Sequence, residues 1–229
     1  MTSNDSSQFS SDRVQTSILS RPEKIALQWL APRLPRWVSP DLLTFIGLFA
    51  MGLTGLGYYL AKFNDGFLWL ASFGLALNWF GDSLDGTLAR VRNQQRPKYG
   101  YYLDHLVDAF GVSIMIYGLA YSELASPEIL WAILTLFLIA SINAYLAAGA
   151  VNVLKISYAK ISTTEARVIL IILNVVLLFA KKVTIFGHRL HLLDFLSLPI
   201  AIFLLYTIIR SASLCLRQLD KEERAKWGK

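Results

Sequence analysis

Six apolar segments of membrane length constrain the fold of this chain more than any other feature. They cover residues 40–61, 67–89, 101–123, 128–151, 165–181 and 192–214, and a helix of about 20 apolar residues can cross a bilayer. The whole chain is 55% hydrophobic and only 17% charged, whereas soluble domains carry about 25% charged residues. The segments lack the alternation of polar and apolar residues that is typical of membrane β-strands. We therefore expect an all-α, polytopic membrane protein with six transmembrane helices.

The regions outside these segments divide the chain further. Residues 1–21 are polar, rich in serine and without the apolar stretch of a signal peptide, so we expect a disordered tail. Residues 22–38 combine Trp and Leu with Lys and Arg, which predicts an amphipathic helix lying on an anionic membrane surface; an ordinary basic linker is the alternative. The six-helix membrane domain would then occupy residues 39–215, and a basic cytoplasmic tail residues 216–229.

Three short sequences mark the expected helix boundaries. Ser39-Pro40 has the pattern of an N-cap residue followed by proline in the first turn. Asn64-Asp65-Gly66 predicts a turn before the second segment, and Ser126-Pro127 predicts the start of the fourth.

The basic residues predict how the chain is oriented in the membrane. With six crossings, the N-terminus, the 90–100 loop, the 152–167 loop and the C-terminal tail lie on one side and hold 18 of the 22 Lys and Arg residues. Because basic loops tend to remain in the cytoplasm, we expect both termini to be cytoplasmic and the protein to reside in an inner or plasma membrane. The single Cys215 excludes a disulfide within the chain.

Four aspartates lie at the expected cytoplasmic ends of the second and third segments: Asp82, Asp85, Asp104 and Asp108. The first pair is spaced i, i+3 and the second i, i+4, so each pair lies on one face of its helix. Two carboxylates about 4 Å apart repel by roughly 4 kcal/mol at an effective dielectric constant of 20, and acids in membrane segments are functional candidates. Bound cations would remove this repulsion, and such hard oxygen ligands suit Mg²⁺, Mn²⁺ or Ca²⁺ better than Zn²⁺. For any single aspartate, helix capping or pairing with an arginine is the alternative.

Small and basic residues accompany the carboxylates. The small residues are Gly86, Ala89 and Gly100. They leave room for a neighbouring helix or for a flat ligand. Arg90 follows Asp85 by five residues, where its guanidinium could reach a phosphate; Arg92 and Arg96 are interpreted as ordinary cytoplasmic loop charges. Asn78, one turn before Asp82, either supports the acidic site or joins two helices, and the latter role is also expected for Asn143, Asn152 and Asn174.

This combination favours an enzyme over two other classes of membrane protein. Carboxylates, bound metal ions and an arginine are typical of phosphoryl transfer, in which one acid can also accept the proton of an attacking hydroxyl. A metal- or proton-coupled transporter also places acids in its spans, but near mid-membrane and often between related halves. A scaffold protein would not require the Asp, Gly, Ala and Arg spacing.

The stretch 82–108 resembles the signature of the CDP-alcohol phosphatidyltransferase family, D-x₂-D-G-x₂-A-R-x₈-G-x₃-D-x₃-D. Every residue named in the signature is present: Asp82, Asp85, Gly86, Ala89, Arg90, Gly100, Asp104 and Asp108. Nine residues instead of eight separate the arginine from the second glycine, and the surplus falls in the 93–98 loop, which tolerates length changes. Residues 40–44 also resemble the family's Pro-Asn-x-x-Thr opening of the first span, with Asp41 in place of asparagine.

The resemblance implies an enzyme of phospholipid biosynthesis that transfers a phospho-alcohol group from a CDP-alcohol, such as CDP-diacylglycerol, to an acceptor hydroxyl and releases CMP. It implies two bound Mg²⁺ or Mn²⁺ ions, with Asp82, Asp85 and Asp104 as ligands. Asp108 would be a ligand, the catalytic base, or both. The resemblance also places Gly86, Ala89 and Gly100 along the cytidine diphosphate site with Arg90 near the phosphates, and it implies a homodimer.

The acceptor alcohol is left open by the sequence. Inositol phosphate, glycerol phosphate, serine and diacylglycerol could all use the same metal site. Lys160 and Arg167 would suit an acceptor that carries a phosphate. His105 could touch phosphate or acceptor, although a structural role is the alternative. The expected partners are the donor, a lipid or small alcohol acceptor and membrane lipids, with no nucleic acid.

Overall fold

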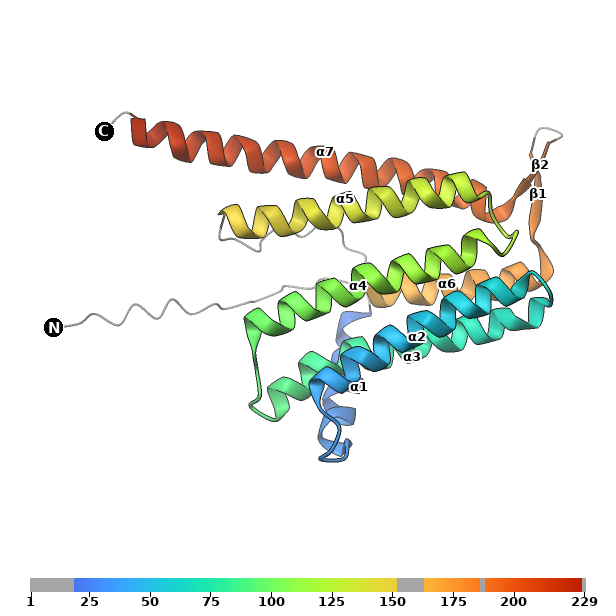
Figure 1. The fold of residues 1–229 in the computed structure, drawn as a ribbon, viewed down its shortest axis with the longest axis horizontal. Helices are drawn as coiled ribbons and strands as arrows, with labels where there is room; N and C mark the ends of the chain where they lie inside the picture. Colours follow the sequence, from blue (N-terminus) through green and yellow to red (C-terminus); the bar gives the residue numbers. More distant parts are fainter. Residues whose placement is uncertain (1–18, 152–162, 186–187, 228–229) are drawn as a thin grey trace.

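The computed structural model describes residues 19–151, 163–185 and 188–227, which form an elongated bundle of helices (Figure 1). Helix α1 (Ser20–Leu30) and the 3-10 helix η1 (Ala31–Arg33) precede the bundle. Six longer helices occupy the positions of the six apolar segments: α2 (Pro40–Ala61), α3 (Leu68–Val91), α4 (Pro97–Ala120), α5 (Pro127–Val151), α6 (Thr163–Phe179) and α7 (Leu192–Trp227). The predicted all-α class is confirmed.

The expected helix boundaries agree with the structure. The Ser39 hydroxyl accepts a hydrogen bond from the Leu42 amide at 3.1 Å, and Pro40 is the first residue of α2. The Asn64 side chain accepts a hydrogen bond from the Gly66 amide at 2.8 Å and opens the 3-10 helix η2 (Asp65–Phe67) before α3. α5 begins at Pro127. These signals are local, so they operate whatever the bundle around them.

Four of the described helices, α2, α4, α5 and α7, are long and apolar enough to cross a membrane. α3 has membrane length, but Asn78, Asp82 and Asp85 make its second half polar. α6 has only 17 residues within the described part of the chain. The protein is therefore an integral membrane protein by the length and composition of its helices, while six crossings remain a prediction.

A β-hairpin between α6 and α7 was not expected from the sequence. Strands β1 (Lys182–Ile185) and β2 (His188–His191) pair antiparallel, with Lys182 opposite His191 (Figure 1). The pairing satisfies backbone amides and carbonyls where the chain reverses between two helices. At its other end, α7 continues as helix through Trp227, so the segment expected as a tail after residue 215 extends the last helix.

α2 is the packing centre of the bundle and contacts both α3 and α4. Glycines allow these close approaches. A Cβ atom on Gly118 of α4 would lie 2.0 Å from the carbonyl oxygen of Gly55 on α2, and one on Gly81 of α3 would lie 2.5 Å from the carbonyl oxygen of Leu43. The close contact with α2 therefore sets the positions of α3 and α4, the two helices that carry the aspartates.

Amide side chains join the helices inside the bundle. Asn174 of α6 accepts a hydrogen bond from the Tyr58 hydroxyl at 3.0 Å and donates one to the Ser72 hydroxyl at 3.1 Å. Asn143 of α5 donates to the Ser211 hydroxyl of α7 at 3.0 Å. The interhelical role expected for Asn143 and Asn174 is confirmed, whereas Asn152 lies outside the described residues.

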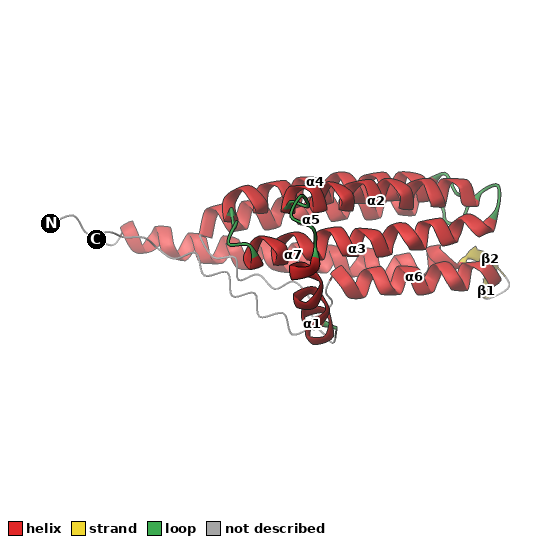
Figure 2. Cartoon of the chain, turned by 90° about the horizontal axis from the view of Figure 1, so that it is seen from below, coloured by secondary structure: helices red, strands yellow, loops and turns green. Residues whose placement is uncertain are grey.

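Helix α1 lies across the direction of the bundle helices (Figure 2). Its Leu27 is buried in a cluster that includes Leu43, Leu84 and Leu88 from α2 and α3. Ile25 and Trp29 remain largely exposed. α1 is amphipathic and its buried face packs on the bundle, but the helix ends at Leu30 and so covers only the first part of the range 22–38 expected for it. Its contact with a membrane surface remains a prediction.

Candidate functional site

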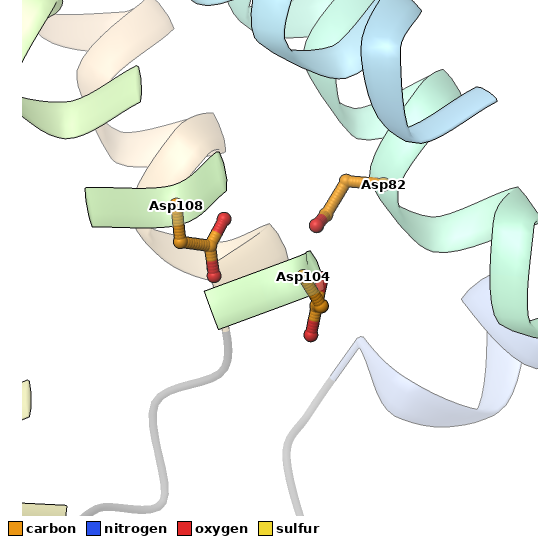
Figure 3. Close-up of side chains that lie close together, drawn as sticks. All are labelled: Asp82, Asp104 and Asp108. Atoms are coloured by element: carbon orange, nitrogen blue, oxygen red, sulfur yellow. The ribbon is translucent and has the colours of Figure 1, made fainter. Parts of the chain in front are cut away.

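Three carboxylates converge between α3 and α4. Asp82 extends from α3, and Asp104 and Asp108 extend from α4 toward the same space (Figure 3). One carboxylate oxygen from each residue lies within 4.8 Å of those of the other two, and all three residues are half-buried. The i, i+4 spacing on α4 explains why Asp104 and Asp108 share a face. Three acids this close require compensating positive charge.

Asp85 lies beside this group and bonds to α2. Its Oδ2 accepts a hydrogen bond from the Thr44 hydroxyl at 2.7 Å, and its Oδ1 accepts from the Gly86 amide. Thr44 belongs to the Pro-Asp-Leu-Leu-Thr sequence at residues 40–44. The four aspartates are therefore arranged as a cluster of three and a neighbouring carboxylate that α2 orients.

A cleft lies beside the acidic group at the ends of α2, α3 and α4. It encloses about 160 Å³. Its lining consists of Pro40, Asp41, Thr44, Asp85, Gly86, Ala89, Gln94, Arg96, Tyr99, Gly100, Leu103 and Asp104. Gly86, Ala89 and Gly100 thus line one cleft, which also includes the carboxylates of Asp85 and Asp104; the binding of cytidine diphosphate there stays a prediction.

The glycines of this cleft differ from those of the helix contacts. A Cβ atom on Gly100 would meet nothing within 4 Å, and one on Gly86 would meet only the Arg90 side chain, at 3.6 Å. Helix packing therefore does not explain these two glycines, and the ligand-access interpretation is favoured. Arg90 is exposed, is absent from the cleft lining and donates a hydrogen bond to the Thr87 hydroxyl at 3.1 Å.

Two loop arginines have structural partners, which corrects their interpretation as ordinary loop charges. Arg96 forms an ion pair with Asp41 and lies over the Tyr99 ring, 4.1 Å from its centroid. The hydrogen bond to Asp41 raises the pKa of the Arg96 guanidinium. Arg92 donates hydrogen bonds to the carbonyl oxygens of Val38 and Leu34. Arg96 therefore connects the α3–α4 loop to the first turn of α2 beside the cleft, and Arg92 connects the loop to the segment that precedes α2.

Arg167, at the start of α6, is a positive charge in direct contact with the acidic cluster. Its Nη2 lies 2.5 Å from Asp82 Oδ2, and its Nε donates to the Asn78 side-chain oxygen at 2.7 Å. Asn78 also donates to the Gly47 carbonyl at 3.0 Å, so it both joins helices and orients Arg167. Nη1 of Arg167 is buried and has no hydrogen-bond partner among the described residues. Lys160, the other residue considered for the acceptor, lies outside the described residues.

His105 belongs to an aromatic group beside the acids. Its Nδ1 lies 2.8 Å from the Tyr101 carbonyl oxygen, and its ring contacts those of Tyr101 and Tyr145 at centroid distances of 4.1 Å and 4.9 Å. These contacts support the structural alternative for His105. Tyr145 was not identified from the sequence, because one tyrosine in an apolar segment carries no distinguishing signal.

Glu23 of α1 was also missed. Its Oε1 accepts hydrogen bonds from Trp79, Ser83 and Thr164, at 3.0, 3.0 and 2.6 Å. It therefore contacts the residue that follows Asp82. Its place in the first turn of a helix would have indicated only a favourable interaction with the helix dipole.

The donor set fits a hard divalent cation. Asp82, Asp104 and Asp108 supply carboxylate oxygens from two helices, and the described residues place no thiolate among them. Such oxygen ligands suit Mg²⁺ and Mn²⁺. Asp85 borders the same space through the cleft that it shares with Asp104.

Comparison with known proteins agrees with the residue pattern of this site. A family model described as CDP-alcohol phosphatidyltransferase matches residues 37–213. A stretch of 95 residues is 34% identical to phosphatidylinositol phosphate synthase of Cutibacterium acnes, covering 41% of this chain and 44% of the relative. A stretch of 73 residues is 42% identical to an uncharacterized protein of Aquifex aeolicus, covering 32% of this chain and 34% of the relative. The chain thus aligns with less than half of the length of either relative.

Proposed function

The chain belongs to the CDP-alcohol phosphatidyltransferase family, and on that premise we propose that it transfers a phosphatidyl group from CDP-diacylglycerol to an acceptor hydroxyl. The acceptor oxygen forms a bond to the phosphorus that carries the diacylglycerol. The bond from that phosphorus to the bridging oxygen breaks, and the electron pair leaves with CMP. The observation that carries this proposal is the convergence of Asp82, Asp104 and Asp108 beside a cleft with open glycines.

The cleft between α2, α3 and α4 is the proposed donor site. Gly86 and Gly100 leave its walls open for the cytidine diphosphate, and Ala89 adds little bulk. Asp85 is held by Thr44 at the boundary between the cleft and the acids. Arg90 stands near the cleft at the helix end, and we propose that it turns toward the donor phosphates.

Asp82, Asp85, Asp104 and Asp108 are proposed to hold two Mg²⁺ or Mn²⁺ ions. Such ions, when bound, neutralise phosphate oxygens and stabilise the leaving group. Asp108 is one turn further into α4 than Asp104, on the same face, and is proposed to accept the proton of the acceptor hydroxyl. General base catalysis of this kind typically contributes about 10²–10⁴-fold to the rate.

The proposed acceptor is a phosphorylated polyol of the inositol phosphate class. The buried Nη1 of Arg167 supports this choice, because it is a cationic donor beside the acids without a protein partner among the described residues. The name of the Cutibacterium acnes relative, phosphatidylinositol phosphate synthase, agrees with it. Lys160, a few residues before α6, is proposed as a second cation for the acceptor phosphate, and His105 as part of the neighbouring wall. The proposed assembly is a homodimer with both termini and the site facing the cytoplasm.

CMP release by the purified full-length protein tests the function directly. The protein is supplied with Mg²⁺ and CDP-diacylglycerol, and separately with inositol phosphate, glycerol phosphate, serine or diacylglycerol. We expect CMP and a new phospholipid with inositol phosphate, and neither product from Asp82→Asn. Asp220→Asn is the matched control, since Asp220 is an exposed acid on α7. A folded wild type that releases no CMP with any acceptor would overturn the proposal, whereas a product with a different acceptor would overturn only the acceptor class.

A further inference from the structure

One carboxylate ties the N-terminal helix to the acidic site. Glu23 Oε1 accepts hydrogen bonds from Trp79 Nε1 and Ser83 Oγ of α3, and from Thr164 Oγ1 of α6. Glu23 therefore connects α1, α3 and α6 through a single oxygen atom. A second bond supports the α1–α6 contact, because the Leu19 amide donates to Glu165 Oε1 at 3.2 Å.

The hydrogen bonds of Glu23 lie next to those of Arg167, because both residues bond to neighbouring positions of α3. On α3, Trp79 and Ser83 directly follow Asn78 and Asp82, the two partners of the guanidinium. On α6, Thr164 and Arg167 are three residues apart, so they lie on one side of the helix. Two neighbouring residue pairs of α3 thus face the same side of α6. Glu23 bonds to Trp79 and Ser83, and Arg167 bonds to Asn78 and Asp82.

We propose that Glu23 is a positioning residue for the acceptor side of the site. By holding Thr164 against Ser83, it fixes the start of α6 at the level where Arg167 meets Asp82. Without it, three donors lose their shared acceptor, and the first turn of α6 loses a contact to α3 and α1 alike. Arg167 then keeps its bonds to Asn78 and Asp82, but the turn of α6 that carries it is less firmly held against α3, so the guanidinium shifts beside the carboxylates. This inference rests on the proposed function, in which Arg167 binds the acceptor phosphate.

The three hydrogen bonds require an oxygen acceptor at the end of the side chain at position 23. All three bonds go to Oε1, so an amide oxygen can replace the carboxylate oxygen, whereas a methyl group cannot. We therefore expect Glu23→Gln to behave nearly as wild type. Glu23→Ala should raise the KM for inositol phosphate by about tenfold, less than the roughly 10²-fold that a misplacement of about 1 Å can cost, because Arg167 keeps its bonds to Asn78 and Asp82. The KM for CDP-diacylglycerol should change by less than about twofold, because the donor cleft does not include these residues.

The experiment measures both KM values and kcat for purified full-length variants with Mg²⁺. Lys24→Ala is the matched control, because Lys24 is the exposed neighbour of Glu23 on α1. Thr164→Val removes one of the three donors while keeping the side-chain shape, and it serves where Glu23→Ala does not fold. If Glu23 acts through Arg167, the effect of Glu23→Ala on the acceptor KM should be much smaller in an Arg167→Lys background.

An unchanged acceptor KM in both Glu23→Ala and Thr164→Val would overturn the inference. So would equal losses in Glu23→Gln and Glu23→Ala, or a rise in donor KM that matches the rise in acceptor KM. These outcomes presuppose an active wild type. A wild type that is folded but inactive with every acceptor would overturn the proposed function instead, so the two failures are distinguishable.

Discussion

Arg167 and Asp82 form an ion pair in which Nη2 lies 2.5 Å from Oδ2, with side chains only 12% and 21% exposed. The pair joins the start of α6 to a cluster of three acids on α3 and α4. A divalent cation that binds Asp82 must share that carboxylate with the guanidinium or displace it. Arg167 is therefore both a partner for the acids and a competitor for their ligand oxygens.

Arg167→Ala should make the protein more dependent on divalent cations for its stability. The change leaves Asp82 without its guanidinium partner, and because both side chains are partly exposed the cost should lie below the roughly 3–5 kcal/mol that is typical of a fully buried ion pair. We expect a lower Tm in EDTA and a larger rise in Tm on adding Mg²⁺ than in wild type. Thermal unfolding in detergent, with and without Mg²⁺, measures both.

The matched control for this prediction is Arg224→Ala. Arg224 pairs with Asp220 on the exposed end of α7, and such i, i+4 pairs contribute about 0.3–0.5 kcal/mol. Its Mg²⁺ response should equal that of wild type. An equal Mg²⁺ response in Arg167→Ala and wild type would contradict the competition between Arg167 and a cation for Asp82.

Transfer should require Mg²⁺ or Mn²⁺ and the carboxylates that bind them. Asp82→Asn, Asp85→Asn and Asp104→Asn should each lower turnover by more than about 100-fold. Even residues that only hydrogen-bond to metal ligands typically contribute about 10–100-fold to metal affinity or activity. EDTA should abolish activity and added Mg²⁺ or Mn²⁺ should restore it. CMP release with unchanged elution in gel filtration is the measurement, and Asp220→Asn is the control. Full activity in EDTA would rule out the metal-dependent mechanism.

The sequence was sufficient for those features that depend on neighbouring residues. The apolar segments predicted the six long helices of the described residues, and Ser39-Pro40 predicted the start of α2, because hydrophobic length and capping act within a few residues. The i, i+4 spacing placed Asp104 and Asp108 on one face. The signature also contains Gly86 and Gly100, which line the cleft in the structure, while their contact with a donor stays a prediction.

Features that depend on contacts between distant residues were missed. Glu23 bonds to Thr164 across 141 positions, and Arg96 pairs with Asp41 across 55. No local pattern distinguishes such residues from exposed charges. For the same reason, spacing alone could not show that Asp85 turns toward Thr44 while Asp82 faces α4, since both lie within one turn of α3.

Membrane topology can be tested by labelling single cysteines in a Cys215→Ser background. Gln95→Cys lies in the exposed α3–α4 loop, and Lys62→Cys lies at the other end of α2, where it breaks only a surface ion pair with Glu123. The division of basic residues predicts that position 95 faces the cytoplasm and position 62 the opposite side. An impermeant maleimide added to intact cells should therefore label position 62 only. Labelling of position 95 from outside would place the acidic site on the outer side of the membrane and contradict the proposed cytoplasmic site.

The contact between α2 and α4 should tolerate no side chain at Gly118. An added Cβ atom would lie 2.0 Å from the Gly55 carbonyl oxygen, and a backbone atom cannot move aside as a flexible side chain would. We expect Gly118→Ala to destabilise the protein by about 1–3 kcal/mol, as overpacking typically does. Gly52→Ala on α2 is the control, because a Cβ atom there would meet nothing within 4 Å. Thermal unfolding should show a lower Tm for the first variant only; equal Tm values would mean that the two helices are further apart.

Replacing Asp108 should lower turnover alone, whereas replacing Asp85 should lower both turnover and donor affinity. Asp85 borders the donor cleft and is fixed by Thr44, whereas Asp108 is absent from the cleft lining and faces Asp82 and Asp104 from deeper in α4. We therefore expect Asp108→Asn to keep its affinity for CDP-diacylglycerol in the presence of Mg²⁺ while turnover falls by about 10²–10⁴-fold, the usual contribution of a general base. Asp85→Asn should lose donor affinity as well as turnover. Nucleotide affinity and CMP release, measured on the same preparations, separate the two roles. If Asp108→Asn loses affinity as completely as Asp85→Asn, Asp108 acts mainly as a metal ligand, and another group must accept the proton.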